Sequence, residues 1–452
     1  MRHERWGEQL VSRSPASAGD ARASAVESRV APAASAIATA PPVGLRAEAA
    51  DLLRRTPWWL TVLTIWAASR AVTTAIMLSF ASRQQANAWT DASPGYLDFA
   101  RLWDGHWYYI IAAVGYPDEI PRDDEGRAGE NAWAFMPVYP GLVRIGMTLI
   151  GDFSAQGFAL VAVTISLLSS AAAAVLFFVL MRRWLTHGTA LLATALFCTM
   201  PLSPVLQVAY AEALHLALLL GALILVLDRH WRLLAVVVTV MALSRPSGLA
   251  FAFLLALVFI WRWMRRDREP FTLRERVHLG LTAVIAGLAG LAWPGIVALS
   301  TGDLLGYTDT ELAWRRPYIG DVHLVPFTPW VQGAQWWLGE VLGVIILIIV
   351  LLLAATAFAL PAMRRMPVEL RLWIVAYSLY LLAVFFPQSS TFRLLLPIVP
   401  VLGAVAAGIV AVGRGPVGRV VLAIVAIALG IVGQVGWVHI AWWVDGYDWT
   451  PP

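Results

Sequence analysis

The chain has 452 residues, of which 59% are hydrophobic and only 14% charged. This balance excludes a soluble domain of ordinary composition and predicts a polytopic membrane protein. The formal net charge of +4 comes from arginine alone, because the sequence contains no lysine, and such an excess indicates membrane orientation rather than nucleic-acid binding. The single cysteine, Cys198, lies in an apolar run, so an intrachain disulfide is excluded and we expect a buried thiol.

Residues 1–55 are rich in Ala, Ser, Pro and Arg without apolar periodicity. They predict a disordered cytoplasmic tail ahead of an integral membrane domain at 56–452. The first predicted span is 58–81, and the arginines just before it hold its start in the cytoplasm. Residues 82–134 then form the first extracytoplasmic loop. The segment 135–150 contains two prolines and one arginine and is short for a span of about 20 residues, so we interpret it as re-entrant or interfacial.

Ten further apolar runs follow at about 155–181, 187–206, 208–227, 231–244, 246–264, 277–300, 334–361, 370–387, 393–412 and 418–440. If 135–150 does not cross the membrane, the arginine clusters between these runs all fall on the cytoplasmic side, as the charge bias requires. The sequence therefore predicts an all-α protein with about eleven transmembrane helices, eleven to thirteen being the range. The N-terminus is then inside, and 301–333 forms a second large extracytoplasmic loop.

The stretch ARLWDGHWYYIIAAVGYP at 100–117 combines an acid, a histidine and a run of aromatic residues. Tyr and Trp favour the headgroup level of a membrane, so this pattern predicts a short interfacial helix with Asp104 at its start. An acid held there could take a proton from a hydroxyl group delivered at the interface. The alternative is that Asp104 only caps the helix, a role worth about 1 kcal/mol. His106 either pairs with Asp104, contacts a headgroup or simply fills an interface position.

Charged side chains at membrane depth are costly, at about 2.5–3.5 kcal/mol each, and usually face a polar cavity. Glu212 is expected to pair with an arginine or to bind a polar ligand. Arg245 precedes a proline and is a candidate phosphate contact, with Arg393 and Arg70 as alternatives for that task. Most of these residues are predicted near the external face, which suggests one polar cavity; the full set is Arg70, Glu212, His215, Arg245, Glu340 and Arg393.

Several familiar motifs are missing from the sequence: a GxxxxGK[ST] loop, HExxH, a cysteine metal cluster and an Asp-x-Asp pair. Their absence disfavours a soluble nucleotide donor and a dedicated metal, and we expect no cofactor. A lipid-linked donor fits an external site better.

Five segments in order resemble the bacterial relatives of the class V phosphatidylinositol-glycan mannosyltransferase, which are GT-C glycosyltransferases. They are WDGHWYYIIAAVGYP, AFMPVYPGLVR, YAEALHLALLLGALILV, ALSRPSGLAFAF and STFRLLLPIVP. The resemblance implies a polytopic GT-C fold, a polyprenyl-phosphate sugar donor that is typically mannose, and a catalytic base in the first external loop, a position that Asp104 matches. Relatives differ where His106, Met136 and Val138 stand, and these departures leave the acid intact.

Together these observations predict a mannosyltransferase of the plasma membrane with an extracytoplasmic active site. It would move mannose from a polyprenyl-phosphate donor to a cell-envelope glycan or glycolipid acceptor by an inverting displacement. Asp104 is the predicted catalytic residue. The predicted substrate contacts are Trp103, His106, Tyr139, Glu212, Arg245 and Arg393. Two alternatives stay open: a transporter or lipid flippase, and a GT-C enzyme that uses another polyprenyl-linked sugar such as arabinofuranose.

Overall fold

A computed structural model describes residues 56–444 of the chain. The predicted tail at 1–55 lies outside the described residues. Within 56–444 the secondary structure is helical, without strands, and the only extended pairing is an isolated bridge between Arg122 and Ala128. The all-α prediction is confirmed for this part of the chain.

The first long helices begin and end close to where hydropathy predicts. Polar caps explain several starts, because the side chains of Ser154, Thr186 and Thr272 each accept a hydrogen bond from a backbone N–H in the first helical turn. The helices are α2 (Trp58–Ala81), α6 (Ala155–Met181), α7 (His187–Thr199), α8 (Glu212–Leu227), α9 (Trp231–Ala242), α10 (Gly248–Met264) and α11 (Leu273–Thr301).

Two of the later predicted spans are broken in the structure. The run at 334–361 divides at Gly339, whose φ of 85° ends α14 (Thr328–Leu338) and starts α15 (Glu340–Ala357). The run at 393–412 divides into α18 (Thr391–Leu394), η3 (Leu396–Ile398) and α19 (Val401–Val412), with a bend of 73° between the two halves. Proline residues 397 and 400 lie at this break and interrupt the helical hydrogen bonds. The last helices are α16 (Pro361–Arg364), α17 (Val368–Val384) and α20 (Gly415–Trp437).

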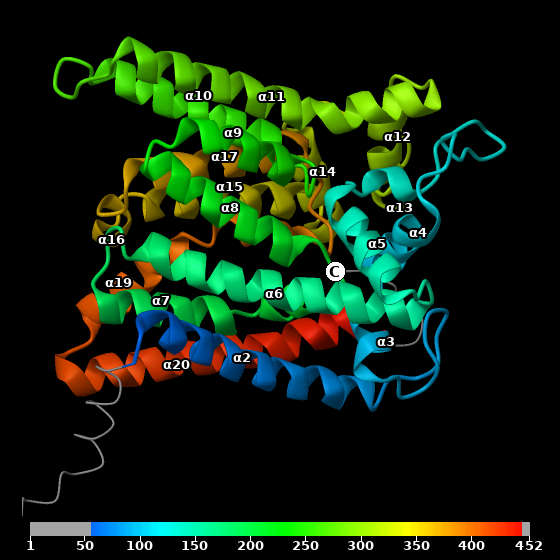
Figure 1. Ribbon diagram of the computed structural model, residues 1–452, viewed down its shortest axis with the longest axis horizontal. Coiled ribbons are helices and arrows are strands. Elements are labelled where there is room, and N and C mark those ends of the chain that lie inside the picture. The colour runs from blue at the N-terminus through cyan, green and yellow to red at the C-terminus, as the bar shows by residue number, and fades with distance from the viewer. Residues whose placement is uncertain (1–55, 445–452) are drawn as a thin grey trace, which may run out of the picture. The chain divides into compact units, whose positions relative to one another are not determined.

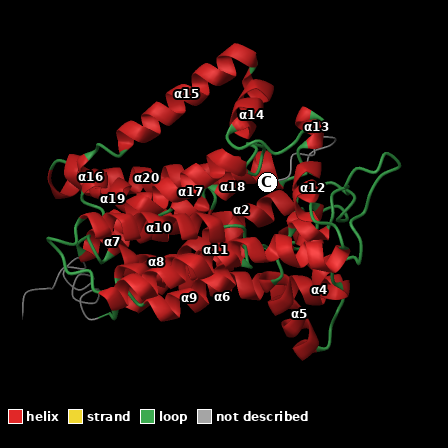
Figure 2. Cartoon of the chain, turned by 90° about the horizontal axis from the view of Figure 1, so that it is seen from above, coloured by secondary structure: helices red, strands yellow, loops and turns green. Residues whose placement is uncertain are grey.

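Five helices in the described part of the chain are long and apolar enough to cross a membrane, or six if the bent pair counts as one span. Five shorter apolar helices accompany them: α5 (Val138–Ile150), α7, α8, α9 and α10. The chain is therefore a helical membrane protein, and the count of eleven crossings stays a prediction. Helix α15 packs beside α14 and stands away from the other helices (Figure 2), with Gly343 as its one buried residue, so its apolar surface suits contact with lipid.

The helices present two different ends (Figure 1). At one, which we call the loop end, lie α3 (Tyr96–Ala100), α4 (Asp104–Val114), α5, α12 (Gly306–Ala313) and α13 (Arg316–Ile319). At the other, the arginine end, lie the α6–α7, α8–α9, α10–α11 and α19–α20 connections. These connections carry the arginine clusters of the sequence. The clusters therefore share one end of the structure, while the side of the membrane on which that end lies stays a prediction.

The two loops at the loop end are tied together by ion pairs and hydrogen bonds. Arg122 Nη2 lies 2.5 Å from Asp303 Oδ2, and Arg316 Nη2 donates to the carbonyl of Ala128 at 3.0 Å. Arg316 Nε also lies 2.7 Å from an oxygen of Asp321. Its neighbour Arg315 donates from Nη2 to the carbonyl of Val384 at 2.6 Å, so both arginines connect separate segments of the protein. The Arg122–Asp303 and Arg316–Ala128 contacts join residues 82–134 to residues 301–333.

Candidate active site

The local backbone places Asp104 at the beginning of α4. Trp103 precedes the helix with φ 60° and ψ −121°, a conformation unusual for a residue with a side chain, and Gly115, with φ 93°, ends it. The indole of Trp103 donates to the carbonyl of Trp442 at 2.9 Å, and the backbone N–H of Asp104 donates to Tyr210 Oη at 3.1 Å. No side chain caps the start of α4, so the Asp104 carboxylate does not act as the helix cap.

The Asp104 carboxylate belongs to a chain of alternating charges drawn from four separate segments. Arg393 Nη1 binds Asp104 Oδ2 and lies 3.1 Å from Glu212 Oε1. The same oxygen of Glu212 lies 2.9 Å from Arg245 Nη1. We call Asp104, Arg393, Glu212 and Arg245 the ion chain. Glu212 therefore pairs with arginine, the first of the two roles expected for an acid in an apolar helix.

The ion chain is withdrawn from bulk solvent and balanced in charge. Its side chains keep 14%, 8%, 3% and 16% of their surface exposed, in the order Asp104, Arg393, Glu212 and Arg245. Two carboxylates and two guanidinium groups cancel, which limits the cost of burying them. Two buried atoms of the chain nonetheless have no hydrogen-bond partner: Glu212 Oε2 and Arg393 Nε. An unpaired buried polar atom costs about 1–3 kcal/mol, so these two atoms mark a place where a polar ligand would be favourable.

Tyrosine side chains form the surroundings of the ion chain. The guanidinium of Arg393 lies over the ring of Tyr210, 5.1 Å from its centre, a stacked arrangement that restricts its orientation. Tyr108, buried on α4, packs edge-on against Tyr210 and Tyr139, with ring centres 6.4 and 5.0 Å apart. Since Tyr210 also accepts the Asp104 N–H, this one residue positions both the acid and the arginine that binds it.

Three of the predicted substrate contacts do not join the ion chain. Trp103 is 7% exposed and lies in the core. Tyr139 is fully buried and its hydroxyl group bonds to the carbonyl of Ala162 and to Ser166 Oγ. His106 is half-buried, and no hydrogen bond or ion pair links it to Asp104 in the described part of the chain. Burial and the charge of Arg101 lower the pKa of His106, which favours the neutral imidazole.

Arg70, Glu340 and His215 also lie apart from the ion chain. Arg70 donates to the carbonyls of Ser203 and Cys198 at 2.7 and 2.8 Å and is therefore a structural connector between α2 and the end of α7, not a phosphate contact. Glu340 is exposed at the start of α15. His215 lies one helical turn beyond Glu212 and shares a hydrogen bond with Ser244. Cys198 is buried, as predicted.

Sequence reasoning missed Tyr210 and Glu311. Tyr210 stands two residues before Glu212, in the same quoted segment, but a tyrosine among apolar residues gives no signal of a role in positioning charges. Glu311, on α12, is one of several acids in its loop and nothing local separates it from them. Its electrostatic partners in the structure include Arg315, Arg245 and Asp104, and burial raises its pKa. Glu311 is thus a further acid that interacts electrostatically with two members of the ion chain, Asp104 and Arg245.

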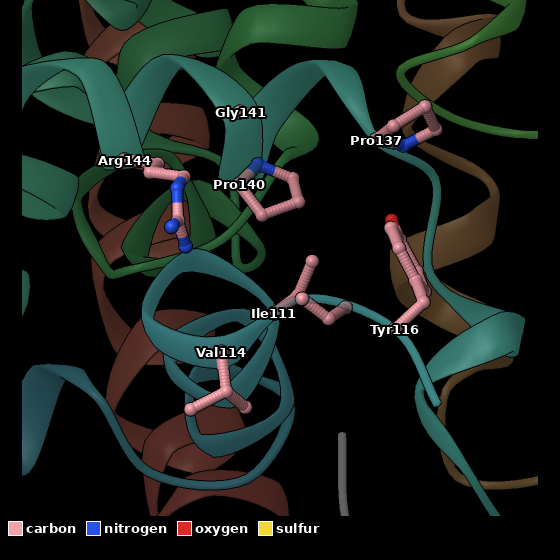
Figure 3. Close-up of a pocket in the computed structure, with 8 residues that line it drawn as sticks. Ile111, Val114, Tyr116, Pro137, Pro140, Gly141 and Arg144 are labelled. Carbon is pink, nitrogen blue, oxygen red and sulfur yellow. The ribbon is translucent and has the colours of Figure 1, made fainter. Parts of the chain in front are cut away.

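A separate hollow of about 310 Å³ lies at the C-terminal end of α4, between that helix and α5 (Figure 3). Its lining is mainly apolar and includes Ile111, Tyr116 and Pro140. The one charged lining residue, Arg144, donates to the carbonyls of Ala112 and Ala113 at the end of α4. The hollow therefore offers no acid or base, and Arg144 helps to hold the helix that begins with Asp104.

Within residues 56–444, no three His, Cys, Asp or Glu side chains come together as a metal site would require. The functional groups that the ion chain offers are thus two carboxylates and two guanidinium groups. The carboxylates can accept protons or hydrogen bonds, and the guanidinium groups match the oxygens of a phosphate.

No family model and no curated protein match this chain. Solved structures similar to it include the archaeal oligosaccharyltransferase AglB from Archaeoglobus fulgidus in complex with an inhibitory peptide and a dolichol-phosphate. The TM-score is 0.46, with 15% identity over 86% of this chain and 56% of that chain. The apo form of the Archaeoglobus fulgidus oligosaccharyltransferase gives a TM-score of 0.48 and 14% identity over 87% and 57% of the two chains. The chain thus spans little more than half the length of these structures. Likenesses of this size do not establish a shared fold, and the peptide and lipid belong to the archaeal protein.

Proposed function

We propose that this protein is a membrane glycosyltransferase that moves a sugar, mannose in the first instance, from a polyprenyl-phosphate donor to a cell-envelope glycan or glycolipid. The observation that carries the proposal is the ion chain. Four charged residues from distant segments converge at one end of an apolar helical protein, and two of their buried atoms have no partner. All four come from segments that resemble the GT-C family, which adds support from the sequence.

The chemistry assigned to the site is a single displacement. Asp104 takes the proton of the acceptor hydroxyl group while that oxygen forms a bond to the anomeric carbon of the sugar. The bond from this carbon to the phosphate oxygen breaks, and its electron pair leaves with the lipid phosphate. The configuration at the anomeric carbon is therefore inverted. General-base assistance of this kind contributes about 10²–10⁴-fold.

The arginines of the ion chain serve the leaving group. Arg393 uses Nη1 for both carboxylates, while Nε has no partner, so its guanidinium has a donor left for a phosphate oxygen. Arg245, held by Glu212, supplies a second positive charge. Fixed charges aimed at a developing negative charge are usually the largest contribution to catalysis. Trp103 and Tyr139 act by positioning α4 and its neighbours, because both are packed in the core.

The proposal is tested by transfer of radiolabelled mannose from polyprenyl-phosphate-mannose, with purified protein in detergent. Asp104→Asn is expected to lower the transfer rate about 100-fold or more, the lower range of general-base assistance. The matched control is Asp98→Asn, since Asp98 is an acid of the same loop that is also paired with an arginine, Arg101, at 3.0 Å. This control is expected to keep the wild-type rate.

Detergent removes any compartment across which a substrate could be moved, so turnover there excludes a pure transporter or flippase. If the protein transfers another polyprenyl-linked sugar, such as arabinofuranose, in place of mannose, the donor assignment is wrong but the glycosyltransferase assignment stands. Full activity of Asp104→Asn would overturn the assignment of the base. No transfer with any lipid-linked sugar would overturn the proposal as a whole.

A further inference from the structure

A second hollow, larger than the one between α4 and α5, lies at the arginine end, away from the ion chain. It has a volume of about 540 Å³ and is formed where the α8–α9 connection meets the first turns of α11. Its charged lining residues are Arg229, Arg232, Arg274 and Glu275, together with the histidines 230 and 278. Figure 1 shows the α8–α9 and α10–α11 connections at the end opposite α4 and α12, so this hollow is a separate feature from the candidate active site.

The charges of the hollow do not cancel. Glu275, its one acid, lies 3.1 Å from Arg262, which is buried, and 3.8 Å from Arg229. The neighbouring acid of the α8–α9 connection, Asp228, is paired with Arg183 at 2.8 Å. Arg232 donates to an imidazole nitrogen of His278, and Arg274 is exposed without an ion pair in the described part of the chain. Two guanidinium groups therefore face the hollow without a carboxylate of their own.

The start of α9 adds to this positive character. This helix has 12 residues, and no side chain caps its first backbone N–H groups. Uncapped N–H groups and the positive end of the helix dipole favour an anion at this position. In contrast, the start of α11 is capped by Thr272, which accepts the N–H of Glu275.

Exposed apolar side chains continue from the hollow along both helices. Leu233 lines the hollow and is 55% exposed, and Val236 follows it by three residues on α9. On α11, Val277 and Leu281 follow Arg274 and His278 by three residues each and are also exposed. Residues three apart are neighbours on a helix surface. The cationic hollow thus adjoins an apolar surface, an arrangement that matches a headgroup together with its hydrocarbon chains.

We propose that this hollow binds the headgroup of an anionic phospholipid. The phosphate lies between Arg232 and Arg274 at the start of α9, and the acyl chains follow the exposed strips of α9 and α11. A free phosphate compound would use the arginines but not the apolar strips, so the lipid is the occupant that accounts for both. Basic hollows between helices at a membrane surface are suited to this kind of recognition.

The test uses the full chain in detergent with dioctanoyl phosphatidylglycerol as the probe. Saturable binding is expected for the wild type, and Arg232→Ala/Arg274→Ala should weaken it by about tenfold or more, because two charged contacts to the phosphate are lost. The matched control is Arg364→Ala/Arg365→Ala. Those two arginines are also exposed but lie at the C-terminal end of α16, outside the hollow, so this control should bind within about twofold of the wild type.

Three results would overturn the proposal: an equal loss of binding in the control pair, equally tight binding of dioctanoyl phosphatidylcholine, or no saturable binding at all. Inorganic phosphate that competes at the same concentration as the lipid would also overturn it, in favour of a free phosphate compound. If the double variant does not fold, Arg274→Glu is the second variant. It changes one exposed residue without an ion pair, and it should abolish phosphatidylglycerol binding while thermal unfolding stays at the wild-type temperature.

Discussion

The guanidinium of Arg393 binds the carboxylate of Asp104 across 289 residues of sequence. The same nitrogen lies 3.1 Å from Glu212 Oε1. A residue assigned to the phosphate and the residue assigned as base are therefore in direct contact. The movement of Arg393 toward a phosphate would free the Asp104 carboxylate to accept a proton. In the proposed reaction, donor binding would thereby be coupled to activation of the base.

Substitutions of Arg393 should distinguish the contribution of its positive charge to the transfer rate from that of its planar guanidinium group. Arg393→Lys keeps the charge but replaces the planar fork by a single ammonium group. We expect a rate of mannose transfer about 10 to 100 times lower, equivalent to one hydrogen bond to a charged group of about 1.5–3 kcal/mol. Arg393→Ala should lose more, because it also leaves Asp104 without its partner. Equal rates for Arg393→Lys and the wild type would contradict a role for the guanidinium fork.

Glu212 and Arg245 should be energetically coupled. Each is buried against the other, with 2.9 Å between Glu212 Oε1 and Arg245 Nη1. A double-mutant cycle with Glu212→Gln and Arg245→Gln, measured as free energy of unfolding in mixed micelles, should give a coupling of about 0.5–3 kcal/mol. The cycle Glu212→Gln with Arg144→Gln is the control, and its coupling should be near zero. Additive effects in the first cycle would show that the ion pair is not formed.

Glu311 should make stability depend on pH. Burial raises its pKa above the ordinary value of 4.5, although Arg315 opposes the shift. The folded protein therefore disfavours the charged carboxylate. The free energy of unfolding should increase as the pH falls through the raised pKa, and this increase is complete once the pH is below the ordinary pKa of a glutamate. Glu311→Gln should remove this increase and raise the unfolding temperature at neutral pH.

The control for Glu311 is Glu119→Gln, a change at an exposed glutamate of the first loop. Thermal unfolding of both variants is followed over the same pH series as the wild type. The same pH dependence in the wild type and in Glu311→Gln would remove Glu311 as its source.

Arg70 should matter for stability and not for transfer. Its guanidinium donates to Ser203 O, Cys198 O and Gln207 Oε1, and a lysine cannot reach this set of acceptors with one ammonium group. Arg70→Lys should lower the unfolding temperature by leaving buried carbonyls unpaired, at about 1–3 kcal/mol for each group. The transfer rate per folded molecule should stay at the wild-type value. A fall in that rate with unchanged stability would instead place Arg70 in the active site.

Local sequence predicted the helices best where hydropathy alone determines their limits. The helices Trp58–Ala81 and Ala155–Met181 have the expected bounds, because an apolar run bounded by polar residues is visible without its neighbours. The same reasoning failed at Gly339 and at Pro397. Both residues lie inside long apolar runs. The hydropathy of such a run does not reveal the backbone conformation at a glycine or a proline that interrupts the helix.

For the candidate site too, local sequence predicted some features and tertiary packing decided the others. The sequence by itself determined that the chain is a helical membrane protein, that Asp104 opens a short helix, and that Glu212 needs a partner, because burial costs and helix signals depend on nearby residues. Only the tertiary structure decided that Arg393 and Arg245 are the partners, that Arg70 is a structural connector and that Glu311 interacts electrostatically with Asp104. Contacts between residues hundreds of positions apart depend on how the helices pack, and a single sequence carries no local signal of that packing.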